Sequence, residues 1–181
     1  MNIVETKLKG CFVIEPRVFN DERGYFFESY NKATFDEVVG SEVNFVQDNE
    51  SYSTKGVLRG LHFQKGEFAQ AKLVRVTQGK VLDVAVDLRP DSDTFLQVET
   101  VVLSSENKKQ LFVPRGFAHG FIVLSDTVVF NYKCDNSYNK ASEGGIIYND
   151  PTLNIDWILD ASEFIVSEKD EVLPTVKHLF K

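Results

Sequence analysis

The sequence contains few residues that would cross-link a domain covalently or anchor it in a membrane. Its two cysteines, Cys11 and Cys134, match neither a zinc motif nor a disulfide framework, so we interpret both as buried thiols. Residues 1–10 lack the apolar core of a signal peptide, and no run approaches the ~20 apolar residues that cross a bilayer. We therefore expect a protein of the reducing cytoplasm with no membrane partner.

Positive charge is also scarce. The chain has 20 lysines and arginines against 27 aspartates and glutamates, which gives a formal net charge of -7. Affinity for nucleic acid depends on a basic surface that releases counterions, so we expect no nucleic-acid partner. An anionic ligand would instead have to be bound by a few local cations.

Several common nucleotide-binding and catalytic motifs are missing. The sequence has no G-x-G-x-x-G, P-loop, G-x-S-x-G or C-x-x-C pattern. The sequence therefore lacks the usual binding motifs for a dinucleotide redox cofactor and for P-loop phosphoryl transfer, and we expect no cofactor. Acid–base chemistry at carbon needs only positioned side chains and remains possible.

Aromatic residues, in contrast, are abundant and lie in short runs. The chain contains 15 Phe, 6 Tyr and 1 Trp, mostly in segments bounded by Gly, Asn, Asp or Pro, a pattern typical of β-strands. Its 181 residues match one ordinary domain, so we predict a single all-β domain over residues 1–181 with a few short helices. Candidate strands cover residues 12–15, 25–30, 43–47, 57–63, 72–77, 80–88, 96–103, 110–113, 119–124 and 127–134.

Local signals predict turns and helices between these strands. Gln78-Gly79 and Ser125-Asp126 each separate two apolar runs, which predicts two tight β-hairpins. Residues 32–39 have a helical pattern. The segment SEKD at 167–170 resembles a capping box and predicts the start of a short helix or turn.

The most specific local motif is PRGFAH at residues 114–119. Its P-x-G-x-x-H form resembles the second motif of the cupins, and Gly56, His62, Gln64 and Gly79 resemble the first. Cupins are jelly-roll barrels that form a double-stranded β-helix, so the resemblance implies a cupin-type fold and agrees with the number of candidate strands.

Many cupins bind a metal through an H-x-H pair and a further histidine, and this sequence departs from that pattern. The second histidine of H-x-H is replaced by Gln64, and the chain has 3 histidines in all, His62, His119 and His178. Even with Glu67 the set is poor for a metal that needs three or four matched donors, so we expect no metal site.

Charged side chains on two strands suggest an anion site. Lys72 shares strand parity with two valines and is expected on the apolar face, where an unpaired ammonium is costly unless an anion binds there. His62 and His119 are either structural histidines or members of this site. Asp83 is free to orient a histidine or to pair with Lys72, whereas we interpret Asp87 as part of a solvated strand face.

Longer segments resemble one enzyme family over essentially the whole chain. These are GVLRGLHFQ (56–64), AKLVR (71–75), GKVLDVAVD (79–87), PRGFAHG (114–120), NYK (131–133), SEGG (142–145) and SEKD (167–170). The chain is similar in all of them to dTDP-4-dehydrorhamnose 3,5-epimerases. The resemblance implies a cofactor-independent, homodimeric isomerase that inverts C3 and C5 of dTDP-4-dehydro-6-deoxy-D-glucose, on the route to the dTDP-L-rhamnose of bacterial surface polysaccharides such as lipopolysaccharide.

The same resemblance implies roles for individual residues. His62 would be the general base, paired with Asp170; Tyr132 would supply a proton on the opposite face of the sugar; and Lys72 would steady the enolate oxygen. The implied substrate-binding residues are Arg23, Glu28, Gln47, Asp48, Asn49, Arg59, His119, Tyr138, Glu143 and Lys169, with Tyr138 stacking on the thymine and the arginines on the diphosphate.

These residue types suit proton abstraction beside a ketone. The reaction needs a base within hydrogen-bond range and a stabilised oxyanion, and inversion needs a proton from the other face. Two points are left open by the sequence. Asp170 has a competing role as a helix cap, over which we favour its pairing with His62. Strict alternation places Arg59 and His62 on opposite strand faces, so we predict a bulge at Gly60.

Three other functions are compatible with the same residues. A 3-epimerase or 5-epimerase of a related deoxysugar pathway would share the base, the acid and the nucleotide pocket. A non-catalytic cupin would bind a nucleotide sugar without turning it over. A metal-dependent cupin isomerase or oxygenase would lose its activity in chelator.

Overall fold

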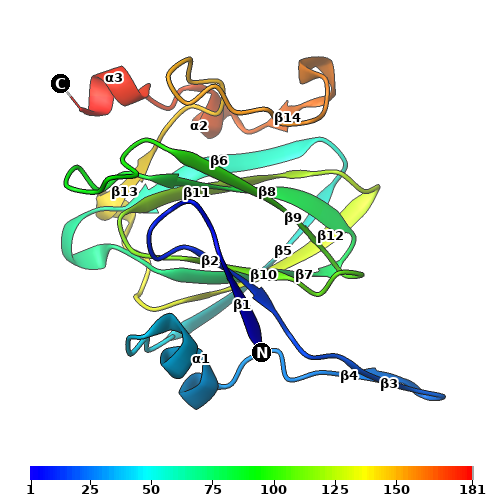
Figure 1. The fold of residues 1–181 in the computed structure, drawn as a ribbon. Coiled ribbons are helices and arrows are strands. Elements are labelled where there is room, and N and C mark those ends of the chain that lie inside the picture. The colour runs from blue at the N-terminus through cyan, green and yellow to red at the C-terminus, as the bar shows by residue number, and fades with distance from the viewer. Residues whose placement is uncertain (181) are drawn as a thin grey trace.

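The computed structural model describes residues 1–180, in which two facing β-sheets form the jelly-roll of a cupin-type fold (Figure 1). The first six-stranded sheet has the order β1(Asn2–Glu5), β2(Phe12–Glu15), β10(Gln110–Val113), β7(Lys72–Gln78), β12(Thr127–Cys134) and β5(Gln47–Thr54). The second has the order β13(Glu143–Gly145), β6(Val57–Gln64), β11(Phe117–Val123), β8(Lys80–Asp87) and β9(Val98–Ser104), and β14(Ile165–Val166) pairs with β6.

Short elements surround the two sheets. The strands β3(Phe19–Asp21) and β4(Gly24–Phe26) form an arm that extends away from the body, and α1(Lys32–Val39) packs below the first sheet (Figure 1). The C-terminal part of the chain, with α2(Glu168–Glu171) and α3(Val176–Leu179), lies over the outer face of the second sheet. Single 3₁₀ turns cover Gly66–Phe68, Lys140–Ser142 and Ala161–Glu163.

The predicted strands agree with the structure best where the apolar pattern is strong. The segments 12–15, 110–113 and 127–134 are confirmed to the residue, as is the helix at 32–39, which begins after the cap Asn31 and ends at Gly40. The strand predicted at 43–47 is wrong, because Val43 and Phe45 pack around Phe35 and the strand begins only at Gln47. The strand predicted at 25–30 ends at Phe26.

Both predicted hairpins are wrong. β7 and β8, on either side of Gln78-Gly79, belong to different sheets, and so do β11 and β12, on either side of Ser125-Asp126. Each of the two turns carries the chain from one sheet to the other, and the two turns are in close contact. Gly79 has a φ of 81°, and a Cβ there would lie 2.0 Å from the carbonyl oxygen of Thr127. Sheet crossings of this kind build the jelly-roll and leave no local sequence signal.

Apolar side chains form three clusters, one of which lies between the first sheet and α1 around Phe35. Val74, Phe121 and Phe130 belong to the core between the sheets, whereas Leu82 and Trp157 belong to a second core between the second sheet and the C-terminal segment. Full burial of such side chains stabilises the fold by about 1.5–3 kcal/mol each. Both faces of β8 are therefore buried, and its aspartates cannot lie on a solvated face.

Asp87 is the clearest departure from the sequence prediction. Its carboxylate is fully buried and accepts hydrogen bonds from Arg89, Ser92 and Thr94, because the loop after β8 folds back over it. Burial by itself would raise the pKa of this carboxyl, but the hydrogen bonds lower it from 3.8 to about 2. The solvated-face interpretation of Asp87 is wrong, and the residue fixes the loop between β8 and β9.

The lowered pKa predicts how Asp87 stabilises the fold as a function of pH. A carboxyl with a depressed folded-state pKa stabilises the folded state above its unfolded pKa of about 4, and this contribution is lost as pH falls towards 2. We expect Asp87→Asn to lower the free energy of unfolding by about 2 kcal/mol at pH 7 and by less as pH falls, measured by urea unfolding. Asp126→Asn, at an exposed carboxylate, is the control. A deficit that stayed constant down to pH 2 would contradict the prediction.

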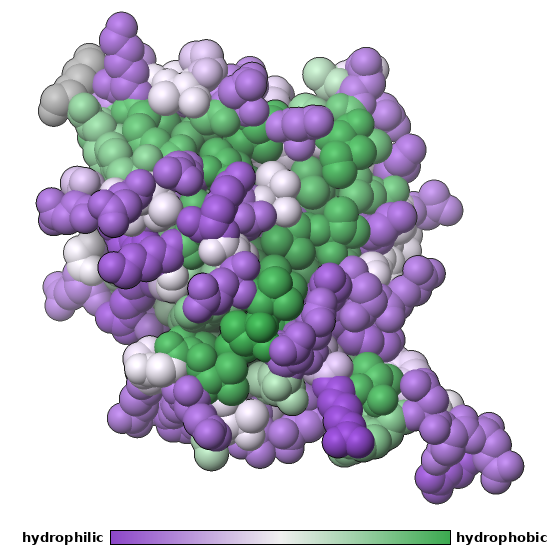
Figure 2. Space-filling model, viewed as in Figure 1, coloured by the Kyte–Doolittle hydropathy of each residue, from purple (hydrophilic) through white to green (hydrophobic). Residues whose placement is uncertain are grey.

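The arm has a polar tip and an apolar base. Tyr25 and Phe26 are 58% and 70% exposed, and Phe19 is also half exposed. Figure 2 shows hydrophobic side chains gathered on the body of the molecule and hydrophilic ones at the far tip of the arm. Exposed aromatic side chains of this kind are a feature of surfaces that contact another molecule.

Candidate active site

A cavity of about 500 Å³ opens between the two sheets beneath the C-terminal segment. Strands β5, β6, β7, β11, β12 and β14 and helix α2 supply its walls, with the polar side chains of Ser51, Arg59, His62, Lys72, His119, Tyr132, Ser167, Lys169 and Asp170. An adjoining cavity of about 340 Å³ shares His62, Lys72 and Tyr132 with it. The two cavities together form a cleft, and these three shared residues lie where they meet.

His62 is held by a carboxylate from the far end of the sequence. Its Nε2 lies 2.7 Å from Oδ1 of Asp170, and the backbone N–H of Gly60 donates to Oδ2 of the same carboxylate at 3.3 Å. Burial would raise the pKa of the Asp170 carboxyl, but the hydrogen bonds from His62 and Gly60 and the charge of Lys169 lower it. The side chain of Asp170 is therefore a buried anion that fixes the imidazole of His62.

The capping role of this helix belongs to Ser167 rather than to the Asp170 side chain. Ser167 Oγ accepts a hydrogen bond from the backbone N–H of Asp170 at 3.2 Å, which places the start of α2 where the SEKD pattern predicts it. The Asp170 carboxylate instead satisfies Gly60 of β6. A four-residue helix thus serves to direct one carboxylate at His62.

Arg59 and His62 reach the same cavity, as the predicted bulge at Gly60 requires. The pairing of β6 with β11 shifts register between His119 and Phe121, opposite this segment, and Gly60 has a φ of 122°. A Cβ on Gly60 would lie 2.7 Å from Cα of Gly120, so the two strands approach too closely there for any other residue. The bulge is confirmed, and Arg59 donates to Ser53 Oγ at 3.1 and 3.2 Å.

A second histidine–aspartate pair lies deeper in the cavity. His119 Nε2 is 2.9 and 3.0 Å from the two carboxylate oxygens of Asp83, whose side chain is fully buried. The sequence left open whether Asp83 would orient a histidine or pair with Lys72. In the structure Asp83 orients His119 and forms no ion pair with Lys72.

Lys72 on β7 and Tyr132 on the neighbouring strand β12 project from the same face of the first sheet, with Nζ of Lys72 5.8 Å from the centre of the Tyr132 ring. Burial lowers the pKa of the Lys72 ammonium, and the nearby Cys134, Asp83 and Glu143 oppose this shift in part. Burial also raises the pKa of the Tyr132 phenol, which keeps its proton at neutral pH. Within residues 1–180 Lys72 makes no ion pair, so its charge is available to a ligand.

Several residues that we expect from the sequence to bind substrate line the adjoining cavity. Gln47 and Asn49 line it and are linked by a 2.9 Å hydrogen bond. Tyr138 is about half exposed and donates to Glu143 at 3.0 Å, and Glu143 forms an ion pair with Lys169. The hydrogen bond to Glu143 thus fixes the orientation of the half-exposed Tyr138 ring.

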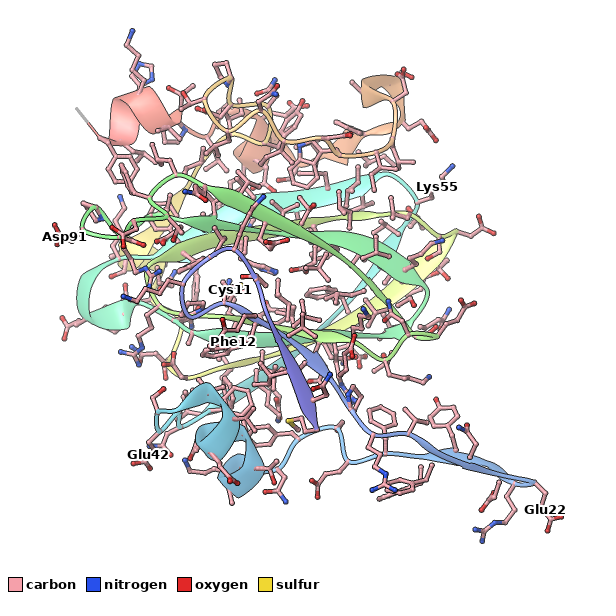
Figure 3. All side chains as sticks on the ribbon, in the orientation of Figure 1. Cys11, Phe12, Glu22, Glu42, Lys55 and Asp91 are labelled. Atoms are coloured by element: carbon pink, nitrogen blue, oxygen red, sulfur yellow. The ribbon has the colours of Figure 1, made fainter. Side chains whose placement is uncertain are left out.

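Three residues expected at the site do not line this cleft. Asp48 lies on the opposite face of β5 from Gln47 and Asn49, as strand alternation requires, and pairs with Lys133 at 2.8 Å. Arg23 is at the tip of the arm, where it bonds Asp21 (Figure 3 marks the neighbouring Glu22). Glu28 lies at the base of the arm and accepts from Asn31 at 3.2 Å.

The sequence prediction missed one serine of the cleft, Ser51. Ser51 and Ser53 share a face of β5 with Asn49, and Ser51 lines the main cavity. Alternation of small polar residues along 47–54 was the available signal, but the strand was predicted elsewhere. Ser51 Oγ is the one buried side-chain N or O atom without a hydrogen-bond partner in the part of the chain that the structure describes.

Among residues 1–180 no group of three or more His, Cys, Asp and Glu side chains is arranged to hold a metal ion. None of the described helices is long and apolar enough to span a membrane. Cys11 and Cys134 are both free and buried, as predicted.

Two histidine–aspartate pairs, a lysine and a tyrosine around one cavity define a cupin-type enzyme equipped for acid–base chemistry. A family model for dTDP-4-dehydrorhamnose 3,5-epimerases matches residues 5–178. The chain belongs to this family, whose members are isomerases.

Individual relatives are similar over their full length. The dTDP-4-dehydrorhamnose 3,5-epimerase of Escherichia coli K12 is 52% identical over 181 residues, which is 100% of this chain and 97% of the relative. A crystal structure of the Elizabethkingia anophelis NUHP1 enzyme of the same name has a TM-score of 0.96 and 58% identity, covering 98% and 97% of the two chains. The 3,5-epimerase of Legionella pneumophila Philadelphia 1, in complex with dTDP-4-keto-L-rhamnose, has a TM-score of 0.94 and 47% identity over 99% and 94%.

Proposed function

We propose that this chain inverts C3 and C5 of dTDP-4-dehydro-6-deoxy-D-glucose to give dTDP-4-dehydro-L-rhamnose. The observation that carries the proposal is one cleft bordered by a carboxylate-held histidine, a protonated tyrosine and an unpaired lysine. Together these supply the base, the acid and the oxyanion partner that epimerisation beside a ketone requires.

His62 is the base in this proposal. Its Nε2 contacts Asp170, which fixes the tautomer and leaves Nδ1 to take the proton from carbon. The electrons of the broken C–H bond form a C=C bond, and the carbonyl electrons move to the C4 oxygen. Lys72 stabilises that oxygen, because a buried ammonium with no ion pair binds an anion strongly.

Tyr132 completes the inversion by donating its proton to the opposite face of the enolate. A single base that returned its own proton would regenerate the starting configuration. Burial keeps the phenol protonated until carbon takes the proton, and water then restores both His62 and Tyr132 to their starting states. Each turnover therefore brings solvent hydrogen into the sugar at the inverted carbon.

The nucleotide is bound in the adjoining cavity. Tyr138 stacks on the thymine, while Gln47, Asn49 and Glu143 contact the nucleoside. Arg59 and Lys169 lie in the main cavity beside α2 and are the cations for the diphosphate. A protein with net charge -7 can bind such a ligand because these cations converge on one cleft.

A test that separates this function from its alternatives is incubation of the purified protein with the substrate in deuterated water, followed by NMR. We expect deuterium at both C3 and C5. Exchange at one carbon alone would identify a 3-epimerase or 5-epimerase, and binding without exchange would identify a non-catalytic cupin. Activity lost in chelator and restored by a metal would identify a metal-dependent enzyme.

We also propose a homodimer in which the arm of one protomer reaches the cleft of the other. Arg23 and Glu28 do not line the cleft of their own chain, and the arm exposes Phe19, Tyr25 and Phe26. A partner would bury these aromatic side chains and receive the two charged groups at its substrate site. The prediction of substrate-binding roles for Arg23 and Glu28 depends on this arrangement.

Substitution of an arm residue tests the dimer. We expect Phe26→Glu to convert a dimer into a monomer in light scattering and to raise the KM for the dTDP-sugar about tenfold or more, because an arginine–phosphate hydrogen bond is lost. Val172→Glu is the matched control, since Val172 is 80% exposed and lies outside the arm. A monomeric wild-type protein would contradict the proposal.

The remaining expectations follow from the same assignment. We propose one catalytic domain over residues 1–181, supported by a family match from residue 5 to 178. Two free, buried cysteines fit a reducing cytoplasm, where sugar nucleotides for dTDP-L-rhamnose and surface polysaccharides would be made.

A further inference from the structure

The pair of Asp83 and His119 has no part in the proton transfers proposed above. Asp83 lies on β8 with 0% of its surface exposed, and among the described residues its carboxylate accepts side-chain hydrogen bonds only from His119. A buried carboxylate without donors is costly, so Nε2 of His119 must carry a hydrogen that it donates to Asp83.

The other nitrogen of His119 faces the substrate space. Nδ1 of His119 makes no hydrogen bond within the described chain. It is nevertheless not a fully buried atom, because among the described residues Ser51 Oγ is the one buried side-chain N or O atom that has no partner. It therefore keeps access to the cavity that His119 lines. With the hydrogen on Nε2, neutral His119 presents Nδ1 to this cavity as a hydrogen-bond acceptor.

Besides Nδ1 of His62, which serves as the base, and Oγ of Ser51, this cavity has few free side-chain acceptors. Lys72, Arg59 and Lys169 present only donors to the same cavity, and the hydroxyl of Tyr132 is required as a donor during turnover. A diphosphate and a ketone have only acceptor atoms, so neither is a partner for Nδ1. The hexose part of the substrate, in contrast, carries hydroxyl groups that can donate.

His62 and His119 are neighbours with different environments. They are direct partners across β6 and β11, and each turns Nε2 to a buried aspartate. The side chain of His62 is 32% exposed and Asp170 has a second donor in Gly60, whereas the side chain of His119 is 8% exposed and Asp83 has His119 alone. The first pair is therefore open to the cleft, whereas the second is almost fully enclosed by the protein.

We propose that Asp83 is a positioning residue that sets the tautomer of His119, so that Nδ1 accepts a hydrogen bond from a hydroxyl group of the hexose ring. This deepens the function proposed above and rests on it, because the ligand must be a nucleotide-linked sugar. The pair would then distinguish a hexose that presents a hydroxyl at this point from one that does not.

The first measurement is the tautomer itself, by ¹⁵N NMR of the imidazole rings. The chain has 3 histidines, so single variants suffice to assign each ring. We expect Nε2–H for His119 in the wild-type protein. In Asp83→Asn the side-chain amide can donate to Nε2, and we expect the hydrogen to move to Nδ1. An unchanged tautomer in this variant would overturn the proposal.

The second measurement is binding of dTDP with and without a hexose, by calorimetry. We expect Asp83→Asn to weaken binding of dTDP-glucose about tenfold and binding of dTDP less than twofold, because only the hexose reaches Nδ1. Equal losses for the two ligands, or no loss for either, would overturn the proposal. If the wild-type protein bound neither ligand, the proposed function would fail, while the tautomer would still report on Asp83.

Two controls separate this role of Asp83 from an effect on stability and from an effect through Lys72. Asp87→Asn removes an equally buried carboxylate from the same strand, and we expect it to reduce stability without changing either affinity. Asp83 also lies near Lys72 and Cys11. In a His119→Phe background, Asp83→Asn should cause no further loss of hexose affinity. A further loss would show that Asp83 acts through Lys72 instead.

Discussion

Replacing His62 with asparagine should lower turnover by at least ~10²-fold while the protein stays folded. Asparagine keeps much of the shape of the imidazole but cannot take a proton from carbon at neutral pH. Positioned acid–base groups typically contribute ~10²–10⁴-fold, and His62 is the residue of the cleft held for this purpose by a buried carboxylate at 2.7 Å. The measurement is deuterium incorporation at C3 and C5 by NMR.

The control for His62→Asn is that binding and folding remain intact. We expect the affinity for dTDP to change little, because the nucleotide lies mainly in the adjoining cavity with Tyr138. The melting temperature should stay within a few degrees of wild type, since His62 is only half-buried. Undiminished deuterium exchange in the variant would exclude His62 as the base.

The sequence was most informative where a local pattern reflects a local cause. The apolar segments at 110–113 and 127–134, the helix after Asn31 and the Ser167 cap follow from propensity, patterning and capping. The bulge at Gly60 was also predictable, because two residues expected at one site stood on opposite strand faces.

Features created by distant parts of the chain were not predictable in this way. The turns at Gln78-Gly79 and Ser125-Asp126 look like hairpins, and only the pairing of their strands with others shows that they cross between sheets. Asp87 looked solvated because the loop that covers it lies outside the strand. The arm carries Arg23 away from the cleft of its own chain, which no pattern within residues 19–26 reveals.

Family resemblance supplied what patterning left open at the site. Spacing alone gives no reason to connect His62 with Asp170, which lies 108 residues away, yet the two side chains are in contact. Conversely, the resemblance assigned no role to Asp83 or Ser51, and the structure shows both at the cavity or directly beneath it.

Replacing Tyr132 with phenylalanine should separate proton exchange from inversion. Phenylalanine fills the same space but cannot donate a proton, so an enolate formed by His62 has no acid on its opposite face. We expect the rate of epimerisation to fall at least ~10²-fold. His62 can still remove a proton and return one from solvent, so deuterium should continue to enter the sugar with retention of configuration.

This outcome would distinguish two roles for the phenol that turnover alone cannot separate. If Tyr132 served mainly to bind the sugar or to support the Lys72 ammonium 5.8 Å from its ring, exchange and inversion would fall together. If Tyr132 is the acid, the rate of deuterium exchange in Tyr132→Phe should fall much less than the rate of inversion. The ratio of these two rates then measures how often the phenol, rather than the imidazole, delivers the proton. Equal losses of both would thus remove Tyr132 from the mechanism and leave the acid to be sought elsewhere in the cleft.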